Sequence, residues 1–211
     1  MNASTHEAVR AEARSYFEGA SPAHDWNHVL RVERLADRLV QDRADVDESV
    51  LELAVYLHDI GRSHEAAGTI DDHAAWGARR TRELLTDWDP DTVDAVCHCI
   101  RSHRYSNDVE PETPAARVLC DADNLDAIGA IGIARAFTHG AEFGQPILDL
   151  AGSTAPRTAV EDSTSVEHIE SKLLSLRDRM YTDAGRRLAA DRHAFVETYL
   201  ERLERETSGT D

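Results

Sequence analysis

Apolar residues recur every three to four positions along most of the chain, which is the spacing of an amphipathic helix. In the clearest example, between residues 26 and 43, the apolar positions are Val29, Val32, Leu35, Ala36, Leu39 and Val40. No segment alternates apolar and polar residues over the length of a convincing strand. The pattern therefore predicts an all-α helical bundle, with helices at about 5–18, 26–43, 50–59, 72–85, 92–103, 114–125, 166–181 and 184–204.

Glycine, proline and short polar residues mark the breaks between these helices. Residues 61–70 are expected to form a loop. The stretch "LDAIGAIGIARAF" (125–137) is expected to continue as helix, with Gly129 and Gly132 allowing close packing. Between about 140 and 165 the composition turns to Gly, Pro, Ser, Thr and acidic residues, which predicts a mobile loop. We find no internal repeat, so one domain is expected over 1–211, ending in two C-terminal helices.

The charge of the chain limits the classes of partner that it can bind and indicates the salt concentration of its surroundings. The formal net charge is -17 and Lys172 is the only lysine, a composition typical of proteins from a high-salt cytoplasm, where counterions screen self-repulsion. An extended nucleic-acid surface is not expected, because phosphate backbones need a basic stripe. No apolar run approaches a membrane span, and the N-terminus lacks the pattern of a signal peptide, so we expect a cytoplasmic protein. A homodimer through the terminal helices is a further hypothesis.

Polar, ionisable residues stand at positions where the core is expected. The apolar helix at 50–59 ends in "VYLHDIG", which sets His58 beside Asp59. His24 and His28 are four residues apart and share a helical face with Arg31. Buried ions of this kind are tolerable only with partners or a bound cation.

A cluster of carboxylates occurs on another helix with apolar neighbours. The stretch "DADNLDA" places Asp121, Asp123 and Asp126 there, and the chain has few lysines to compensate them. Together with His28 and the His58–Asp59 pair, this cluster predicts a divalent metal site.

These residues resemble the signature of the HD-domain superfamily of metal-dependent phosphohydrolases, which is H…HD…D. The flanking stretches "SPAHDWNHVLRV", "AVYLHDIGR", "DDHAAWGARRTRELL", "CIRSHRYS" and "DADNLDAIGAIGIARAF" are similar to one branch of small HD hydrolases, some of which cleave nucleoside triphosphates. The resemblance covers about residues 4–140. It implies an HD-domain helical bundle whose metal ligands are His28, His58, Asp59 and Asp123.

The resemblance also implies a reaction. Water activated by the ion would attack the phosphorus of a phosphate ester or anhydride, with a nucleotide as the leading small phosphorylated substrate. Two imidazoles and two carboxylates suit Mn, Fe, Co or Ni better than Zn, and Mg is conceivable. We expect catalytic roles for Asp59, Arg62, His73 and His103. We expect substrate binding at His24, Asp25 and Arg31.

Several alternatives stay open on the sequence alone. His73 and His103 can instead bind a second ion. A di-iron oxygenase with the same fold is a second hypothesis, which would require two irons and additional ligands at His73 and His103. A non-catalytic module that binds a nucleotide or a partner protein is a third hypothesis. His24 and Asp25 can be turn and N-cap residues, and Asp121 and Asp126 can support the site without binding the ion. Glu65 is a candidate general base, although a glutamate on a polar loop is ordinarily exposed.

Overall fold

The computed structural model describes residues 5–41, 43–104, 109–150 and 164–210, and over these ranges the chain is helical and forms no strand. The all-α prediction is therefore confirmed. Contacts along the chain divide it into two compact units, residues 1–123 and 124–211. The expectation of one domain over the whole chain stays a prediction.

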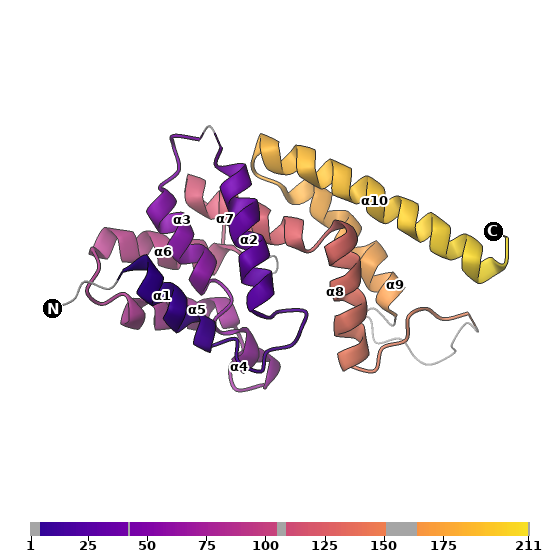
Figure 1. The fold of residues 1–211 in the computed structure, drawn as a ribbon, viewed down its shortest axis with the longest axis horizontal. Helices are drawn as coiled ribbons and strands as arrows, with labels where there is room; N and C mark the ends of the chain where they lie inside the picture. Colours follow the sequence, from indigo (N-terminus) through magenta and orange to yellow (C-terminus); the bar gives the residue numbers. More distant parts are fainter. Residues whose placement is uncertain (1–4, 42, 105–108, 151–163, 211) are drawn as a thin grey trace. The chain divides into compact units, whose positions relative to one another are not determined.

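The N-terminal unit holds the first six helices and most of the seventh, coloured indigo to pink in Figure 1. Within it α3 packs against α1, α2 and α6, and α5 packs against α6. The bounds are α1 (His6–Ser15), α2 (Trp26–Leu39), α3 (Glu48–Leu57), α4 (Arg62–Ala66), α5 (His73–Leu84), α6 (Pro90–Ser102) and α7 (Pro114–Asp126).

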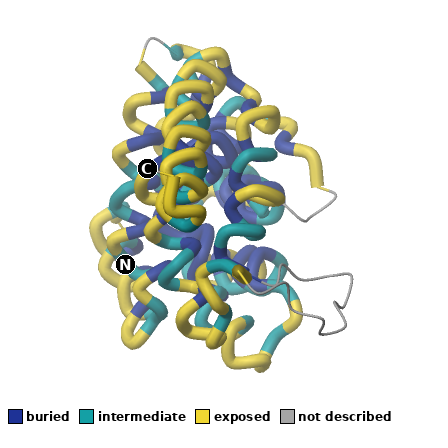
Figure 2. The backbone as a smooth tube through the Cα atoms, turned by 90° about the vertical axis from the view of Figure 1, so that its right-hand side faces the viewer, coloured by how far each residue is buried: buried dark blue, intermediate teal, exposed yellow. Residues whose placement is uncertain are grey.

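Helix α3 is the centre of this unit because it is apolar on nearly every side. Seven of its ten residues are buried, from Val50 to Leu57 with the exception of Glu52. A helix that is hydrophobic all round must be covered all round, and three neighbouring helices cover this one. Figure 2 shows buried segments in the interior and exposed turns outside them. The segment that follows α3 therefore begins deep in the core, and this places His58.

Four helices of this unit begin at an aspartate whose side chain accepts hydrogen bonds from the first backbone N–H groups. These N-caps are Asp25 for α2, Asp47 for α3, Asp72 for α5 and Asp89 for α6. Such a carboxylate satisfies unpaired donors and opposes the positive end of the helix dipole. Part of the acidic excess therefore has a structural role.

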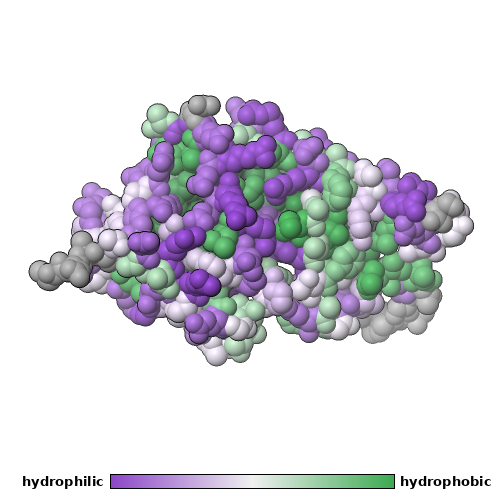
Figure 3. Space-filling view, in the orientation of Figure 1, coloured by the Kyte–Doolittle hydropathy of each residue, from purple (hydrophilic) through white to green (hydrophobic). Residues whose placement is uncertain are grey.

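The C-terminal unit pairs α8 (Gly129–Glu142) and α10 (Asp183–Ser208) with a short irregular helical segment between them. That segment is α9 (Ser165–His168), a π-helical turn (Ile169–Leu173) and a 3₁₀ stretch (Leu174–Arg179). Large apolar side chains stay exposed on this unit, and Figure 3 shows green surface on it. They are Ile131, Phe143, Ile147, Leu150, Tyr181 and Phe195.

Three details of the predicted helices are wrong. Residues 61–70 hold the short helix α4 within the expected loop. The expected helix over 125–137 is interrupted, because Gly129 adopts a left-handed φ of 79° and α8 starts there. The expected helix at 166–181 is the irregular segment described above, and the 3₁₀ stretch ends at Arg179.

Other details hold. A Cβ at Gly132 would lie 2.2 Å from the Ala127 oxygen, so the close approach predicted at this glycine is present. Residues 143–150 are not helical, but 151–163 lie outside the described residues, and the mobile loop therefore stays a prediction. Among the described residues, no helix is both long and apolar enough to cross a bilayer.

Candidate metal centre

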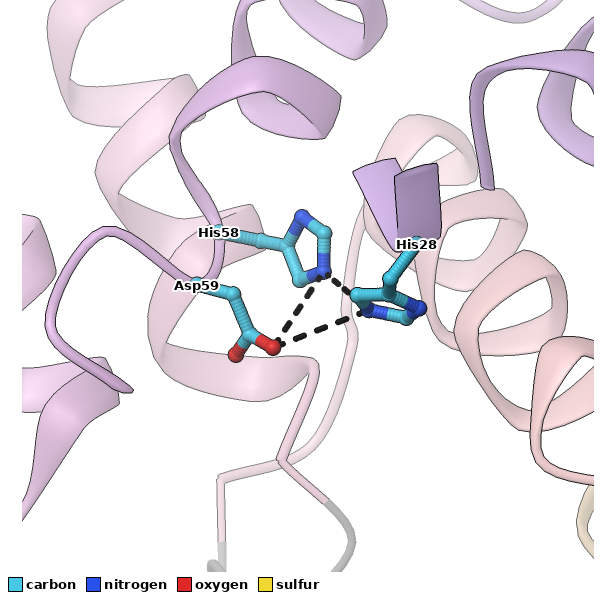
Figure 4. A group of neighbouring side chains, drawn as sticks. All are labelled: His28, His58 and Asp59. Carbon is cyan, nitrogen blue, oxygen red and sulfur yellow. Dashed lines mark hydrogen bonds and ion pairs between the residues drawn. The ribbon is translucent and has the colours of Figure 1, made fainter. Parts of the chain in front are cut away.

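The site begins where α3 ends. His58 is the C-cap residue of α3 and Asp59 follows it, so both emerge from the most buried helix of the N-terminal unit. The Asp59 side chain is 1% exposed and that of His58 is fully buried. Figure 4 shows the His28 ring, which comes from α2, turned toward this pair.

One oxygen of Asp59 faces the first group of ligands. Its Oδ2 lies 3.6 Å from His28 Nε2 and 3.9 Å from His58 Nε2, and the two Nε2 atoms are 3.2 Å apart. Asp123 of α7 reaches the same group, with its Oδ1 3.4 Å from His28 Nε2. The four residues predicted as metal ligands are thus brought together by α2, the end of α3 and α7.

The other oxygen of Asp59 faces a second group. Its Oδ1 lies 3.3 Å from His73 Nε2, 3.4 Å from Arg62 Nη2 and 3.5 Å from His103 Nε2. The side chains of both histidines are 0% exposed. Asp59 therefore connects two sets of nitrogen atoms, one on each carboxylate oxygen.

The chemistry of these atoms fits a divalent cation. His58 Nδ1 lies 2.8 Å from the Val55 carbonyl, a contact that requires the proton on Nδ1 and leaves a lone pair on Nε2. Three buried atoms of this centre have no hydrogen-bond partner: Asp59 Oδ1, His73 Nε2 and His103 Nε2. Unpaired buried acceptors are costly, and a cation would satisfy them. Two triples, His28–His58–Asp59 and Asp59–His73–His103, each place ligand atoms within 4.8 Å of one another.

Burial and neighbouring charges set the protonation of the centre. Burial lowers the pKa of His58 to about 4 and that of His73 to about 4, against the opposing effect of Asp59. Burial alone would raise the pKa of Asp59, but Arg62 and His58 hold this pKa well below its ordinary value. Neutral imidazoles beside an ionised carboxylate are the protonation states that metal ligands need.

The residues predicted to bind substrate occupy three different settings. His24 lies at the edge of the centre, with Nδ1 3.9 Å from Asp59 Oδ2. Asp25 caps α2 by accepting hydrogen bonds from the backbone of Asn27 and His28, as in the alternative interpretation. Arg31 lies on α2 one turn after His28 and is partly exposed.

Asp121 and Asp126, the other two carboxylates considered on α7, lie in different surroundings. Asp121 is fully buried and acts with Asp45 to raise the pKa of Arg43. Asp126, in the C-terminal unit, forms a 2.8 Å ion pair with Arg135 of α8.

Glu65 and Arg104 have contacts that sequence reasoning did not anticipate. The sequence offers Glu65 as a candidate general base near the metal, with an ordinary exposed glutamate as the alternative; its side chain is 20% exposed and contacts His73. Arg104 lies 2.8 Å from Glu65 and was not singled out at all. The only available signal was position, since Glu65 falls between Arg62 and His73, and Arg104 directly follows His103.

Gly61 is required by the close approach of α5. A Cβ at this position would lie 2.7 Å from the backbone oxygen of His73 and 3.0 Å from its Cα. We expect Gly61→Ala to lower the free energy of unfolding by about 1–3 kcal/mol, because the backbone that carries His73 must move. Urea denaturation followed by circular dichroism measures the change.

Gly77→Ala provides a matched control on α5. A Cβ there would make ordinary contacts, the nearest being 3.5 Å from Ile100 Cγ2. Replacing a glycine inside a helix should stabilise the protein by about 0.5–1 kcal/mol. Equal effects of the two substitutions would contradict the proposed packing of Gly61 against α5.

With the fold and centre described, the chain can be placed among known proteins. Residues 25–128 match the HD domain, and this range contains every residue of the centre described above except His24. The chain belongs to the HD-domain family. Proteins of this family are in general metal-dependent phosphohydrolases, and HD domains bind divalent metals.

Individual relatives extend the match over nearly the whole chain. The uncharacterized protein YpgQ of Bacillus subtilis strain 168 is 29% identical over an alignment that covers 97% of this chain and 95% of YpgQ. A crystal structure of YpgQ in complex with ADP is similar with a TM-score of 0.75 at 30% identity, covering 98% of this chain and 100% of that one. An HD-superfamily hydrolase from Bacillus thuringiensis is 28% identical, with a TM-score of 0.73 and 96% of each chain covered.

Proposed function

We propose that this protein hydrolyses a phosphate ester or anhydride of a small phosphorylated metabolite, and that a nucleotide is its leading substrate class. The observation that carries the proposal is the buried Asp59 carboxylate, whose two oxygens face four fully buried imidazoles and a guanidinium. The complex of the relative YpgQ with ADP supports the choice of a nucleotide.

In this proposal His28, His58, Asp59 and Asp123 hold the ion. Two nitrogen and two oxygen ligands favour Mn, Fe, Co or Ni over a closed tetrahedral zinc site, and Mg can also be accommodated. When bound, the ion supplies Lewis acidity, which lowers the pKa of water and polarises a phosphate oxygen.

The residues near Asp59 Oδ1 have a separate role in the proposed reaction. Arg62 keeps its positive charge beside Asp59 Oδ1 and can neutralise charge that develops on phosphate oxygens. His73 and His103 present Nε2 atoms on the same side, where reacting groups would lie. His24 is partly exposed at the edge of the centre, a position suited to contact with substrate.

A metal-by-substrate screen tests the proposal. Purified protein, kept in high salt because of its net charge of -17, is assayed with Mn, Fe, Co, Ni, Mg or Zn against nucleoside mono-, di- and triphosphates and sugar phosphates. We expect phosphate or pyrophosphate release with at least one nucleotide. His58→Ala should lose both metal and turnover while its far-ultraviolet circular dichroism is preserved, and undiminished turnover in this variant would contradict the site.

The residues around Asp59 Oδ1 are also compatible with one other function. Asp59, His73 and His103 form a triple able to hold a second ion that shares Asp59 with the first, as a di-iron oxygenase requires. Metal analysis separates the two functions. One ion per chain with hydrolysis supports the phosphohydrolase, whereas two irons per chain with oxygen consumption support the oxygenase. Metal binding without turnover of any substrate would indicate a non-catalytic module.

A further inference from the structure

The imidazoles around Asp59 differ in how their second nitrogen is held. His58 and His103 each follow the last residue of a helix, and each Nδ1 contacts the backbone carbonyl three residues earlier. The distances are 2.8 Å to Val55 O and 2.6 Å to Ile100 O. The last carbonyls of a helix lack intrahelical donors, so they accept these N–H groups readily. The backbone of α3 and of α6 therefore fixes both rings.

His73 cannot be held in the same way. It is the first residue of α5, and the start of a helix offers unpaired N–H groups instead of carbonyls. Its Nδ1 lies 2.8 Å from Glu65 Oε2, and its backbone N–H donates to Glu65 Oε1 at 3.3 Å. One carboxylate therefore holds both the ring and the backbone of His73.

Glu65 is itself fixed from two sides. Arg104 Nη1 donates to its Oε1 at 2.8 Å, and Arg62 Nη1 lies 3.6 Å from its Oε2. Arg104 directly follows His103, and Arg62 contacts Asp59. These contacts connect Glu65 to the three segments that carry Asp59, His73 and His103.

We propose that Glu65 is a positioning residue: it holds the proton of His73 on Nδ1 and keeps the bare Nε2 aimed at Asp59 Oδ1. This role rests on the proposed function only for its effect on turnover, because the contacts of Glu65 with His73 are the same whichever reaction the protein catalyses. A carboxylate behind a metal-binding or reacting imidazole fixes the tautomer and raises the basicity of the ring, and its loss typically costs about 10–100-fold in activity or metal affinity.

The direct test is nitrogen NMR of the imidazole rings in the metal-free protein. In the wild type, Nδ1 of His73 should carry the proton and Nε2 should show the shift of an unprotonated nitrogen. In Glu65→Ala the proton should redistribute between the two nitrogens, while His58 and His103 keep theirs on Nδ1. An unchanged His73 signal in Glu65→Ala would overturn the proposal.

Another carboxylate, Glu83 of α5, supplies the matched control. Glu83 is 65% exposed and pairs with Arg80, so Glu83→Gln removes a similar charge without touching the centre. This variant should keep the wild-type tautomer of His73 and the wild-type turnover. A change in the His73 signal here would mean that charge alone, and not the contact with Glu65, sets the tautomer.

Activity and metal content then separate positioning from direct proton transfer. Glu65→Ala should lower kcat about 10–100-fold. Glu65→Gln should recover much of this loss, because its amide oxygen can still accept the Nδ1–H. Equal losses in the two variants would indicate that Glu65 carries a proton itself and would overturn the positioning role. If neither the wild type nor any variant hydrolyses a phosphorylated substrate but the NMR result holds, the proposed function fails and the positioning role stands.

Discussion

Asp59→Asn should abolish metal retention and turnover together while the helices remain folded. The substitution keeps the shape of the side chain but replaces one of the two oxygens that face the two groups of nitrogen atoms. It also removes the negative charge that compensates Arg62. Because the loss of an outer partner already costs about 10–100-fold, loss of the shared ligand should cost more. Metal analysis and initial rates measure the effect.

Thermal unfolding gives a readout that does not depend on the identity of the substrate. An ion present at about 100 times its Kd should stabilise the wild type by about 2.7 kcal/mol, and Asp59→Asn should gain nothing from the same ion. Asp45→Asn is the control, because Asp45 is exposed and pairs with Arg43. Full turnover or metal-dependent stabilisation in Asp59→Asn would show that the centre is assigned wrongly.

Acidification of the metal-free protein should reduce its stability well before its carboxylates titrate. His58 and His73 have pKa values of about 4 in the folded chain and 6.5 as the ordinary value. The unfolded chain therefore binds protons between these values while the folded chain does not, and stability falls as the pH drops from 6.5 toward 4. Each group contributes up to about 3 kcal/mol over that range.

Other groups of the centre act differently over the same range. The pKa of His103 is raised above its ordinary value of 6.5 because Asp59 and Asp123 outweigh burial, so its stabilising contribution is already complete at pH 6.5 and stays constant as the pH falls further. The pKa values of Asp59 and Asp123 are lowered, so their stabilising contribution is lost only below pH 3.8. A net fall of a few kcal/mol between pH 7 and pH 4.5 is expected.

Urea titrations at pH 7, 6, 5 and 4.5 in constant high salt measure this fall. His58→Gln should flatten the dependence, because one of the two depressed imidazoles is gone. A free energy of unfolding that stays constant from pH 7 to pH 5 would contradict neutral, buried histidines in the metal-free protein.

Much of the fold could be predicted because local periodicity and burial agree. The apolar stripe of α2 and the nearly continuous apolar run of α3 each indicated a helix, and both are helices. The break at Gly129 was not predicted, because its left-handed backbone has no separate signature in a glycine-containing apolar run. The irregular segment after Ser165 was missed because π, 3₁₀ and α-helices share similar side-chain patterns.

The candidate ligands could be singled out because they are polar residues in apolar surroundings. His28, His58 and Asp59 stood out in this way, and the structure brings them together. Glu65 and Arg104 stand on polar stretches where charged residues are ordinary. Their contacts arise only when the segments after α3 and α6 meet at the start of α5. Such a meeting depends on tertiary packing, and apart from the positions of the two residues near Arg62 and His103 the local sequence does not indicate it.

The matching ends of α3 and α6 bear on protein engineering. Both imidazoles take their orientation from the carbonyls of their own last turn, and the two helices pack against each other. A scaffold with two helices that stop side by side could therefore receive this pair of histidines without any supporting side chains of its own. Conversely, apolar substitutions buried between α3 and α6 would adjust the distance between the two rings without changing either histidine.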